Sequence, residues 1–338
     1  MKAAVLYAPF DMRVEEVSTP DCGMDQVLVK VKAAGICGSD VHFYEGTHPY
    51  KNYPRIHGHE FAGEIVKLGG NASGFSVGDH VVIEPLKACG KCYPCRHGKY
   101  NCCTKLQVIG AHTDGGFAEY IAVETKNLHK IPQDMPFEMA AALEPYSIGA
   151  HCSNRAEITS GEVVLILGAG AIGLTVTDYA KLLGARVIVV DTSQTRLELA
   201  KSMGADDVIN PLAEDVNARV MQLTDNEGAG IVIEATGVAK VMENTENLVA
   251  SGGKIIIIGL TNDKVAFTGI NFTKNEMTVL GSRNSANEFP QIIADASSGK
   301  IHPELLVTHR FKFDNVVEAF KYAKDNISSV GKIVLIFD

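Results

Sequence analysis

Short apolar runs separated by Pro, Asp and Gly dominate the first part of the chain. Residues that favour β-strands are frequent in Lys2–Tyr7, Arg13–Ser18 and Gln26–Ala34, and Val81–Ile83 is a further short run of this kind. No long helical period interrupts these runs. Turn-rich short strands of this kind predict an irregular, barrel-like β domain over residues 1–146.

The pattern changes near residue 147, where apolar strands begin to alternate with helical spacings. This alternation predicts an α/β domain with a doubly wound parallel sheet of the Rossmann type. From residue 289 the chain holds two helical patterns and a last strand, Lys332–Phe337, so the tail lacks the alternation. The strand-like runs include 163–167, 187–190, 231–233 and 254–258, and helical spacing lies at 172–183, 196–203, 216–223 and 238–249.

Length and charge narrow the classes of function. A chain of 338 residues exceeds the size at which a single core usually stops growing, so two domains are expected. The formal net charge of -9 argues against nucleic-acid partners, which usually select a basic protein. The longest apolar run, Val163–Val176, contains three glycines and is too short to span a membrane. We therefore expect a cytoplasmic protein that binds a small molecule and neither nucleic acid nor a membrane.

A glycine-rich turn follows the run 163–167 directly and opens a helical stretch. Its pattern, G-x-G-x-x-G, is typical of dinucleotide binding. The first glycine permits a tight turn, the second lets the backbone approach a pyrophosphate, and the third allows the helix to pack on the strand. The helix N-terminus then offers N–H groups to the phosphates. The predicted cofactor contacts in this turn are Gly168, Gly170, Ala171, Ile172 and Gly173.

An acidic residue ends the next strand-like run. Asp191 stands about 20 residues after the turn, where a carboxylate binds the adenosine ribose hydroxyls and repels a 2′-phosphate. Arg196 is a further candidate contact that could offset this repulsion, although we expect it on the outer face of the following helix. The sequence therefore predicts NAD in preference to NADP.

Five of the eight cysteines fall between residues 89 and 103. In a long cytosolic chain such clustering indicates a metal site in preference to disulfides. The two-residue gaps between Cys89, Cys92 and Cys95 let a turn fold three sulfurs around one tetrahedral ion, and a fourth thiolate closes a structural zinc site. The spacing alone leaves Cys102 and Cys103 open as the fourth ligand.

A second set of metal-binding residue types lies earlier in the chain. Cys37, His59 and a carboxylate would supply three protein ligands and leave the fourth position open, which a catalytic zinc requires. The sequence therefore predicts two zinc ions per chain, one in a closed structural site and one in an open catalytic site.

These features together resemble the zinc-dependent medium-chain dehydrogenase family, and most closely its sorbitol (polyol) dehydrogenase-like branch. The resemblance covers essentially the whole chain. The motifs that carry it are Gly35-Ile-Cys37-Gly-Ser39-Asp40-Val-His42, Gly58-His59-Glu60, Gly78-Asp79-His80, the four cysteines, Asp114-Gly-Gly-Phe117, Leu143-Glu144-Pro145 and the dinucleotide turn.

The resemblance implies the domain organisation. A GroES-like catalytic zinc domain of residues 1–146, completed by 289–338, would flank a Rossmann NAD-binding domain of residues 147–288. The active site would lie between the two domains. The family also implies a homodimer or homotetramer, joined partly through sheet edges such as Met277–Gly281.

The resemblance also implies the ligands of the catalytic zinc. Cys37 and His59 match two ligands, and Glu144 matches the third protein ligand, where simpler alcohol dehydrogenases have Cys. Glu60 matches an acid that either binds the metal or waits beside it. Which of the two glutamates binds is expected to depend on the catalytic state. The rivals of Glu144 for its position are His151 and Cys152.

Further roles follow from the same resemblance. Asp40 resembles the acid that fixes the tautomer of the ligand histidine. Ser39 resembles the hydroxyl that takes the substrate proton and passes it through the nicotinamide ribose to His42. Cys103, in preference to Cys102, matches the fourth ligand of the structural zinc.

The substrate is the least determined part. Arg283 resembles an arginine that reaches the hydroxyls of polyols, and a guanidinium could equally pair with a sugar-acid carboxylate. Phe43 and His112 match positions in the wall of the substrate pocket. The stretch around Arg283 resembles galactonate-type sugar-acid 5-dehydrogenases as much as sorbitol dehydrogenases. Phe43 and Ser285 depart from the sorbitol dehydrogenase pattern.

We therefore predict a zinc- and NAD-dependent oxidoreductase acting on a secondary alcohol of a polyol or sugar acid. The alternatives are a threonine-type or simple secondary-alcohol dehydrogenase of the same fold and, in a different class, a non-catalytic NAD-binding structural protein. Loss of Cys37, His59 or Ser39 would favour the last alternative, and all three residues are present.

Overall fold

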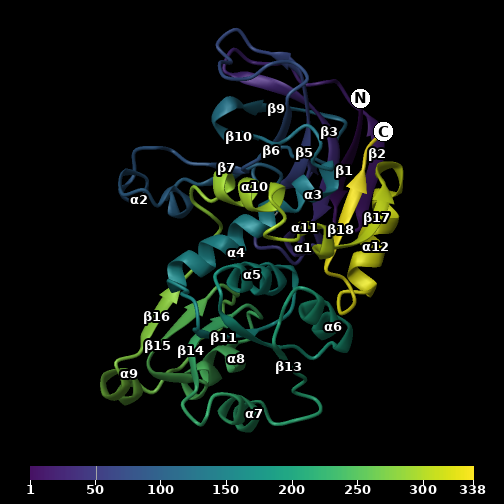
Figure 1. Ribbon diagram of the computed structural model, residues 1–338. Coiled ribbons are helices and arrows are strands. Elements are labelled where there is room, and N and C mark those ends of the chain that lie inside the picture. The colour runs from purple at the N-terminus through teal and green to yellow at the C-terminus, as the bar shows by residue number, and fades with distance from the viewer. Residues whose placement is uncertain (51) are drawn as a thin grey trace. The chain divides into compact units, whose positions relative to one another are not determined.

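The computed structural model describes residues 1–50 and 52–338, and these form two compact units. Unit 1 comprises Met1–Glu144, Phe289–Ser297 and Val307–Asp338, and unit 2 comprises Pro145–Glu288 and Ser298–Leu306. Figure 1 shows the sheets and helices of each unit. The predicted tail is therefore divided, because the short segment 298–306 lies with unit 2. Among the described residues, no helix is both long and apolar enough to cross a membrane.

Unit 1 is built mainly from antiparallel strands. Its largest sheet has the order β10-β6-β5-β3-β18-β17, with β9 also paired to β3, beside the smaller sheets β2-β1-β4 and β7-β8. The central strand β3 is buried along most of its length, which explains its apolar and β-branched sequence. The strands are β1 (Lys2–Ala8), β2 (Asp11–Glu16), β3 (Gln26–Ile36), β4 (Arg55–Ile56), β5 (Glu60–Leu68), β6 (His80–Ile83), β7 (Leu86–Lys87), β8 (Gln107–Val108), β9 (Tyr120–Glu124), β10 (Leu128–Lys130), β17 (Val307–Lys312) and β18 (Lys332–Ile336).

Short helices join and cover these strands. Strand β18 pairs antiparallel with β3, so residues near the two ends of the sequence lie side by side in the largest sheet. Helix α12 carries Phe320 into the core against Tyr44 and Phe117. The helices of unit 1 are α1 (Gly38–Glu45), α2 (Tyr93–Arg96), α3 (Phe137–Ala141), α10 (Phe289–Ser297) and α12 (Val316–Asp325), with 3-10 turns η1 (Tyr100–Cys102), η2 (Thr125–Asn127) and η4 (Phe313–Asn315).

Unit 2 contains a fully parallel sheet in the order β13-β12-β11-β14-β15-β16. The strand order reverses between β11 and β14, and ligands of doubly wound sheets bind outside the carboxyl ends of the strands at such a point. The strands are β11 (Val163–Leu167), β12 (Arg186–Val190), β13 (Asp207–Ile209), β14 (Ala229–Glu234), β15 (Val249–Ile257) and β16 (Thr278–Gly281). The helices are α5 (Ala171–Leu182), α6 (Gln194–Ser202), α7 (Val216–Leu223), α8 (Ala239–Asn244), α9 (Gly269–Asn275) and α11 (Pro303–Leu306), with η3 (Thr245–Asn247), and α4 (Leu143–Ala156) continues into unit 2 from unit 1.

The predicted fold class is confirmed, and one element differs. The helical spacing at 238–249 predicted one helix, whereas α8 ends at Asn244 and the strand β15 already begins at Val249. Gly252 has a φ of 77°, a conformation that an α-helix does not contain, and the pairing of β14 with β15 shifts register nearby. Two adjacent glycines therefore belong to an irregular strand entry that the apolar spacing concealed.

Candidate functional site

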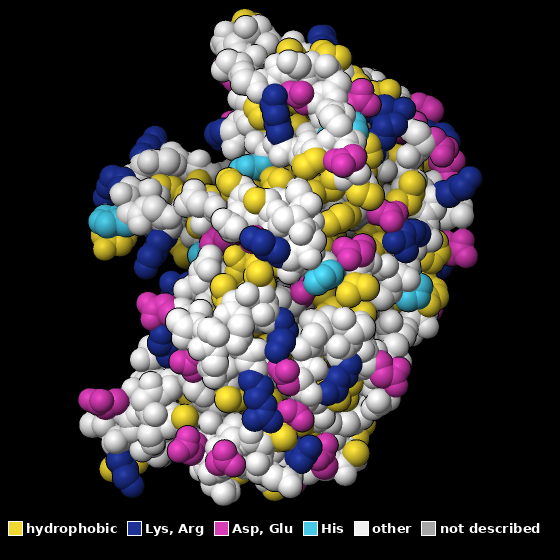
Figure 2. Space-filling model, in the orientation of Figure 1, with side chains coloured by type: hydrophobic (Ala, Val, Ile, Leu, Met, Phe, Trp, Pro, Cys, Tyr) yellow, Lys and Arg dark blue, Asp and Glu magenta, His cyan; other side chains and the backbone are white. Residues whose placement is uncertain are grey.

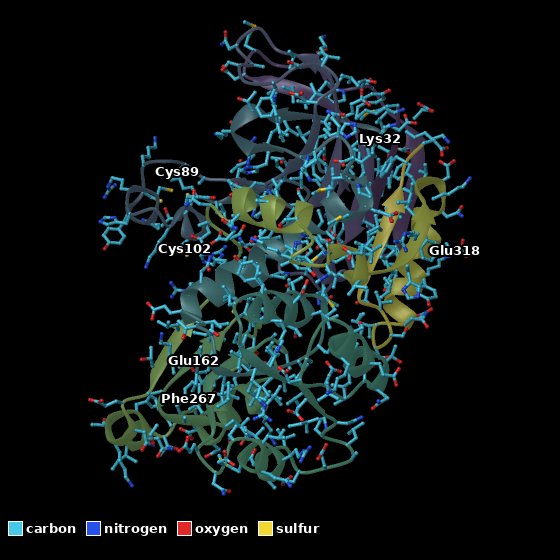
Figure 3. The ribbon with its side chains drawn as sticks, viewed as in Figure 1. Lys32, Cys89, Cys102, Glu162, Phe267 and Glu318 are labelled. Atoms are coloured by element: carbon cyan, nitrogen blue, oxygen red, sulfur yellow. The ribbon has the colours of Figure 1, made fainter. Side chains whose placement is uncertain are left out.

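Four cysteines of unit 1 lie together on a lobe that follows β7. The sulfur atoms of Cys89, Cys92, Cys95 and Cys103 all lie within 4.8 Å of one another. Cys92 caps the N-terminus of α2, which brings its Sγ to 3.3 Å from the Sγ of Cys95, and Cys103 follows η1. Cys102 is exposed and lies outside the group, although Figure 3 shows it on the same lobe as Cys89. The geometry thus favours Cys103 over Cys102 as the fourth sulfur.

The surroundings of these sulfurs fit a metal ion. Backbone N–H groups of Cys89 and Lys105 both donate to the Sγ of Cys103, at 3.3 Å. Backbone N–H groups also lower the pKa of Cys92 to about 5, whereas desolvation and neighbouring sulfurs raise the pKa of Cys95 to about 12. Four thiolates around one divalent ion leave a net negative charge. Figure 2 shows Lys and Arg side chains around this lobe, where Lys91, Arg96 and Lys99 are exposed, so the lobe itself offsets that charge.

A buried carboxylate that sequence reasoning missed connects this lobe to the barrel. The Oη of Tyr100, on η1, donates to Glu84 at 2.6 Å, and the Nε2 of His129, on β10, lies 3.0 Å from the second oxygen of the same carboxylate. The ring of His129 stacks on Phe289 of α10. These contacts fix the lobe independently of the cysteines. Apart from its place after an apolar strand, Glu84 carries no signal in the sequence.

The second candidate metal site lies where α1 and β5 begin. Cys37 is the residue before α1, His59 precedes β5, and Glu60 is the first residue of β5. Their ligand atoms lie within 4.8 Å of one another. Buried Asp40 faces the Nδ1 of His59 at 3.6 Å and accepts a hydrogen bond from the backbone N–H of Cys37 at 2.9 Å. One acid thus orients two of the three predicted ligands.

The electrostatics of this group fit a bound cation. Burial alone would lower the pKa of His59, but the charges of Asp40 and Cys37 raise it well above its ordinary value. Burial, together with the charge of Glu60, raises the pKa of Glu144 to about 7. The Oδ1 of Asp40 and the Oε2 of Glu60 are buried and have no hydrogen-bond partner among the described residues. A sulfur, an imidazole and buried carboxylates in excess are a donor set suited to zinc.

The glycine-rich turn of unit 2 has the conformation that its pattern predicts. Gly168 follows β11 directly and has a φ of 102°, and a Cβ built on Gly173 would lie 1.8 Å from the carbonyl oxygen of Gly168. Nothing lies within 4 Å of a Cβ built on Gly170, so the turn is open where a pyrophosphate would approach. Ala171 and Ile172 begin α5 directly afterwards.

A cavity of about 620 Å³ lies at the strand-order reversal of the unit 2 sheet and is lined by Gly168, Gly170 and Asp191. The carboxylate of Asp191 accepts hydrogen bonds from the backbone N–H groups of Ala169 at 2.7 Å and Ser193 at 2.8 Å. Arg196 is half-buried and lines the same cavity, so its expected position on an outer helix face is wrong. The cavity also borders Lys240, which the sequence did not indicate.

Two family models match the chain: the alcohol dehydrogenase GroES-like domain over residues 23–133 and the zinc-binding dehydrogenase over residues 171–298. L-galactonate-5-dehydrogenase of Escherichia coli K12 is 38% identical over 339 residues, which cover 100% of this chain and 99% of the relative. L-threonine 3-dehydrogenase of Pyrococcus horikoshii is 39% identical, with 94% and 93% covered. An alcohol dehydrogenase structure from Escherichia coli CFT073, complexed with NADH, superposes with a TM-score of 0.94 at 35% identity, with 100% and 99% covered. The chain belongs to the zinc-binding dehydrogenase family.

The family predicted from the sequence is thus confirmed, and the structure locates the residues of its predicted proton path. Ser39 and His42 both lie on α1, directly after Cys37. The imidazole of His42 is exposed, and its Nδ1 lies 3.1 Å from the Oγ1 of Thr47. A short helix therefore carries a half-buried hydroxyl near the candidate ligands and an imidazole at the surface.

The three residues predicted to contact substrate have different surroundings. Phe43 is only 1% exposed, because it packs in the barrel core between the rings of His48, at 3.7 Å, and His57, at 4.4 Å. Its ring is therefore buried and does not offer an exposed surface to a ligand. His112 accepts a hydrogen bond from the backbone N–H of Val108 at 3.1 Å. Arg283 is exposed and follows β16 in unit 2.

One further residue of this zinc-binding dehydrogenase adjoins the candidate ligands. The Nζ of Lys332, on β18, lies 2.6 Å from the Oε1 of Glu60. Burial alone would lower the pKa of Lys332, but the charges of Glu60 and Cys37 raise it above its ordinary value. Sequence reasoning missed this lysine because it stands 272 residues from its partner.

Proposed function

We propose that this chain is a zinc-dependent, NAD-linked dehydrogenase that oxidises a secondary alcohol of an open-chain sugar acid or polyol. The observation that carries the proposal is the group of Cys37, His59 and Glu60, in which the ligand atoms of three different donors lie within 4.8 Å of one another and Asp40 faces the histidine. The substrate class rests on the full-length similarity to L-galactonate-5-dehydrogenase and on the exposed guanidinium of Arg283. A guanidinium binds carboxylates and hydroxyl groups with directional hydrogen bonds.

The residues divide the chemistry between them. In this proposal Cys37, His59 and either Glu60 or Glu144 hold the catalytic zinc, which when bound supplies Lewis acidity that lowers the pKa of an alcohol. Asp40 keeps the imidazole of His59 in the tautomer that leaves one nitrogen free as a ligand. Cys89, Cys92, Cys95 and Cys103 hold the structural zinc and take no part in the reaction.

The other residues handle the cofactor and the proton. The turn around Gly170 would hold the pyrophosphate of NAD, which when bound would supply a hydride acceptor. Ser39 would accept the proton of the substrate hydroxyl, and the exposed His42 would release a proton to water. Asp191 binds the adenosine ribose, where its charge disfavours a 2′-phosphate. The thiolates of both metal groups need a reducing compartment, which supports a cytoplasmic location.

A substrate panel tests the proposal. The purified protein should reduce NAD⁺ with hexonates or polyols, followed as absorbance of NADH. Cys37→Ser should abolish this turnover, whereas Cys22→Ser, a half-buried cysteine outside both metal groups, should leave it unchanged. Turnover with threonine alone would favour a second candidate function, that of a threonine-type dehydrogenase, which the 39% identity to L-threonine 3-dehydrogenase supports. Binding of NAD without turnover of any alcohol would favour a non-catalytic protein.

Metal analysis and cofactor preference test two parts separately. The two ligand groups predict two zinc ions per chain, of which Cys89→Ser should remove one and Cys37→Ser the other. A zinc content that Cys89→Ser leaves unchanged would contradict the structural site. Asp191→Ala should raise the use of NADP relative to NAD by at least about tenfold, or about 1.4 kcal/mol. Glu198→Ala, an exposed acid on the neighbouring helix α6, serves as the matched control.

We also propose a homodimer or homotetramer joined through the edge of the unit 2 sheet. β16 is an edge strand, and Val279 on it is 36% exposed, while Ile270 on the preceding helix is 70% exposed. An apolar edge strand is a template for pairing with a second copy. Val279→Lys should shift the mass measured by light scattering toward the monomer, whereas an unchanged mass would exclude this edge.

A further inference from the structure

A buried glutamate lies at the carboxyl end of the unit 2 sheet, next to the dinucleotide cavity but outside its lining. Strand β14 lies between β11 and β15 (Figure 1), and its last residue, Glu234, is the register partner of Leu167 on β11 and of Ile257 on β15. The side chain of Glu234 is 0% exposed, although a glutamate is seldom fully buried unless it is paired. Burial raises the pKa of Glu234, and hydrogen bonds from Thr236 and Gly237 oppose this rise. The contacts of the carboxylate therefore have to offset its desolvation.

This carboxylate bonds to the chain segment that directly follows it, residues 235–238, which we call the β14 loop. The Oε1 of Glu234 accepts hydrogen bonds from the backbone N–H of Thr236 at 2.7 Å and from that of Gly237 at 3.1 Å. It also accepts one from the hydroxyl of Thr236, whose oxygen in turn accepts from the backbone N–H of Val238 at 3.0 Å. Each of these donors is a neutral group. A single carboxylate oxygen therefore fixes the path of the β14 loop.

The β14 loop packs directly against the dinucleotide turn. A Cβ built on Gly168 would lie 3.0 Å from the Cγ2 of Thr236 and 3.2 Å from the carbonyl carbon of Ala235. Ala235, Thr236 and Val238 line the same cavity as Gly168, and Val238 is 51% exposed. The loop therefore forms part of the wall that a dinucleotide would contact, while the residue that fixes its path lies behind that wall.

The same glutamate also contacts the end of the next strand. A Cβ built on Gly259, which follows β15, would lie 2.5 Å from the Oε2 of Glu234 and 2.3 Å from the backbone nitrogen of Gly237. The backbone N–H groups of Ile258 and Gly259 both donate to the carbonyl oxygen of Glu234 at 3.0 Å. Gly237 has a φ of 73°, and its own Cβ would lie 2.7 Å from the carbonyl oxygen of Leu260. Glycines at 237 and 259 therefore leave the space in which the carboxylate joins the ends of β14 and β15.

We propose that Glu234 is a positioning residue for the cofactor, which holds the β14 loop in the conformation that a dinucleotide requires. The inference rests on the proposed function only in requiring NAD in the unit 2 cavity, and it depends neither on a metal ion nor on the identity of the alcohol. Because Glu234 lies outside the lining of the cavity, it acts through Thr236 and Val238. A ligand binds only the fraction of molecules in which the loop is correctly formed, so loosening the loop lowers the apparent affinity by that fraction.

Titration calorimetry with NADH on the zinc-loaded full chain, together with the melting temperature, tests the inference. Glu234→Gln keeps an oxygen that accepts from Thr236 and Gly237, and its amide nitrogen replaces the oxygen that makes only the longer contact of 3.4 Å with Gly237. Its affinity for NADH should therefore stay within about twofold of the wild type. Glu234→Leu removes the acceptor and should weaken NADH binding at least about tenfold, or about 1.4 kcal/mol. Such a loss corresponds to a correctly formed loop in about one-tenth of the molecules.

Variants of two threonines separate positioning from a general loss of stability. Thr236→Ser keeps the hydroxyl of the β14 loop and should bind NADH like the wild type, whereas Thr236→Val should bind it at least about threefold more weakly. The matched control is Thr224→Val in the turn before β14, where the hydroxyl donates to the carbonyl of Val220 at 2.8 Å and accepts from the N–H of Gly228 at 3.1 Å. Thr224 is not among the residues that line the cavity, so Thr224→Val should lower the melting temperature without changing the affinity for NADH.

The outcomes separate this inference from the proposed function. If Glu234→Leu binds NADH within about twofold of the wild type, the inference is overturned and the proposed function stands. Equal weakening in Glu234→Gln or in Thr224→Val would also overturn it, because the cause would then be lost charge or lost stability of unit 2. If Glu234→Leu does not fold, the threonine pair decides, and equal binding by Thr236→Val and Thr236→Ser overturns the inference. A wild type that binds no NADH would overturn both the inference and the proposed use of NAD.

Discussion

The buried carboxylate of Asp178 in unit 2 offers a quantitative test of how the dinucleotide helix is held. Asp178 lies on α5, is 3% exposed, and accepts a hydrogen bond from the Oη of Tyr146 on α4 at 2.6 Å. The same carboxylate accepts from the backbone N–H of His302 at 2.6 Å and lies 3.1 Å from its Nδ1. One acid therefore joins α4, α5 and the segment that precedes α11.

Tyr146→Phe removes one hydroxyl from this network and leaves the ring in place. A hydrogen bond to a charged group contributes about 1.5–3 kcal/mol, and the bond is short and fully buried, so we expect a loss of about 2 kcal/mol. For a domain of this size 1 kcal/mol corresponds to about 2–4 °C, so the transition of unit 2 should fall by about 4–8 °C. Differential scanning calorimetry of the wild type and the variant, matched in metal content, measures the shift.

A surface bond of the same length provides the control. The Oη of Tyr7 donates to Glu15 at 2.6 Å, with both side chains at the surface of unit 1. Because exposed groups exchange such bonds for bonds to water, Tyr7→Phe should change stability by less than about 0.5 kcal/mol. If both variants cost the same, or if Tyr146→Phe leaves the transition within 1 °C of the wild type (less than about 0.5 kcal/mol), the reasoning from burial fails.

The stability of unit 2 in alkaline buffer gives an independent check on the role of Tyr146. Burial and the charge of Asp178 raise the pKa of Tyr146 well above its ordinary value. The folded state therefore keeps a proton that the unfolded state loses above about pH 10. The stability contributed by this phenol is fully present below that pH and declines as pH rises further. The difference between wild type and Tyr146→Phe should accordingly shrink in strongly alkaline buffer.

Two other predictions follow from local geometry. Gly170→Ala should leave the melting temperature unchanged but weaken NAD binding at least about tenfold, because its Cβ meets no protein atom and faces the phosphate approach. Gly173→Ala should instead destabilise unit 2 itself, since its Cβ would lie 1.8 Å from the carbonyl oxygen of Gly168. Calorimetry with NAD titration distinguishes them, and equal stability losses would contradict the assignment. After zinc removal under reducing conditions, Cys92, with a pKa of about 5, should be alkylated at a rate independent of pH between 6 and 8, ahead of Cys95, whose pKa is about 12. Mass spectrometry of the labelled peptides measures both rates, and a tenfold rise per pH unit at Cys92 would refute its thiolate state.

Features encoded by local spacing could be predicted from the sequence. The glycines of the dinucleotide turn and the cysteines of the α2 lobe act within a few residues, where chain geometry leaves little choice. The strand 163–167 and the helix 216–223 were predicted at their observed bounds, because both are delimited by turn or capping residues. Metal-ligand residue types indicated Cys37 and His59, the resemblance to a known family added Asp40, and the structure brings these three together.

Features that depend on partners far apart in the chain could not be predicted. Phe43 has the residue type of a substrate wall, yet it is buried in the barrel core, where Phe117 and Phe320 from distant segments belong to the same cluster. The position of Arg196 depends on how far α6 is rotated about its axis, and a single charged residue does not report that rotation. An isolated Lys or Glu in a sequence is most often exposed to solvent, so its burial can be inferred only when its charged partner is known.

The contacts missed in this way converge on the end of the chain. Lys332 reaches Glu60, His302 reaches Asp178, and Arg310 donates from its Nε and Nη2 to the two oxygens of Glu138. Strand β18 is also apolar and buried beside β3, so the same residues that close the barrel deliver the ammonium to the candidate metal ligands. A candidate metal group whose ligands all precede residue 145 therefore has a buried cation beside it that comes from β18, far along the chain. The barrel core and the buried ion pair depend on the same pairing, because the sheet register that buries Ile333 and Val334 is also the register that brings Lys332 to Glu60.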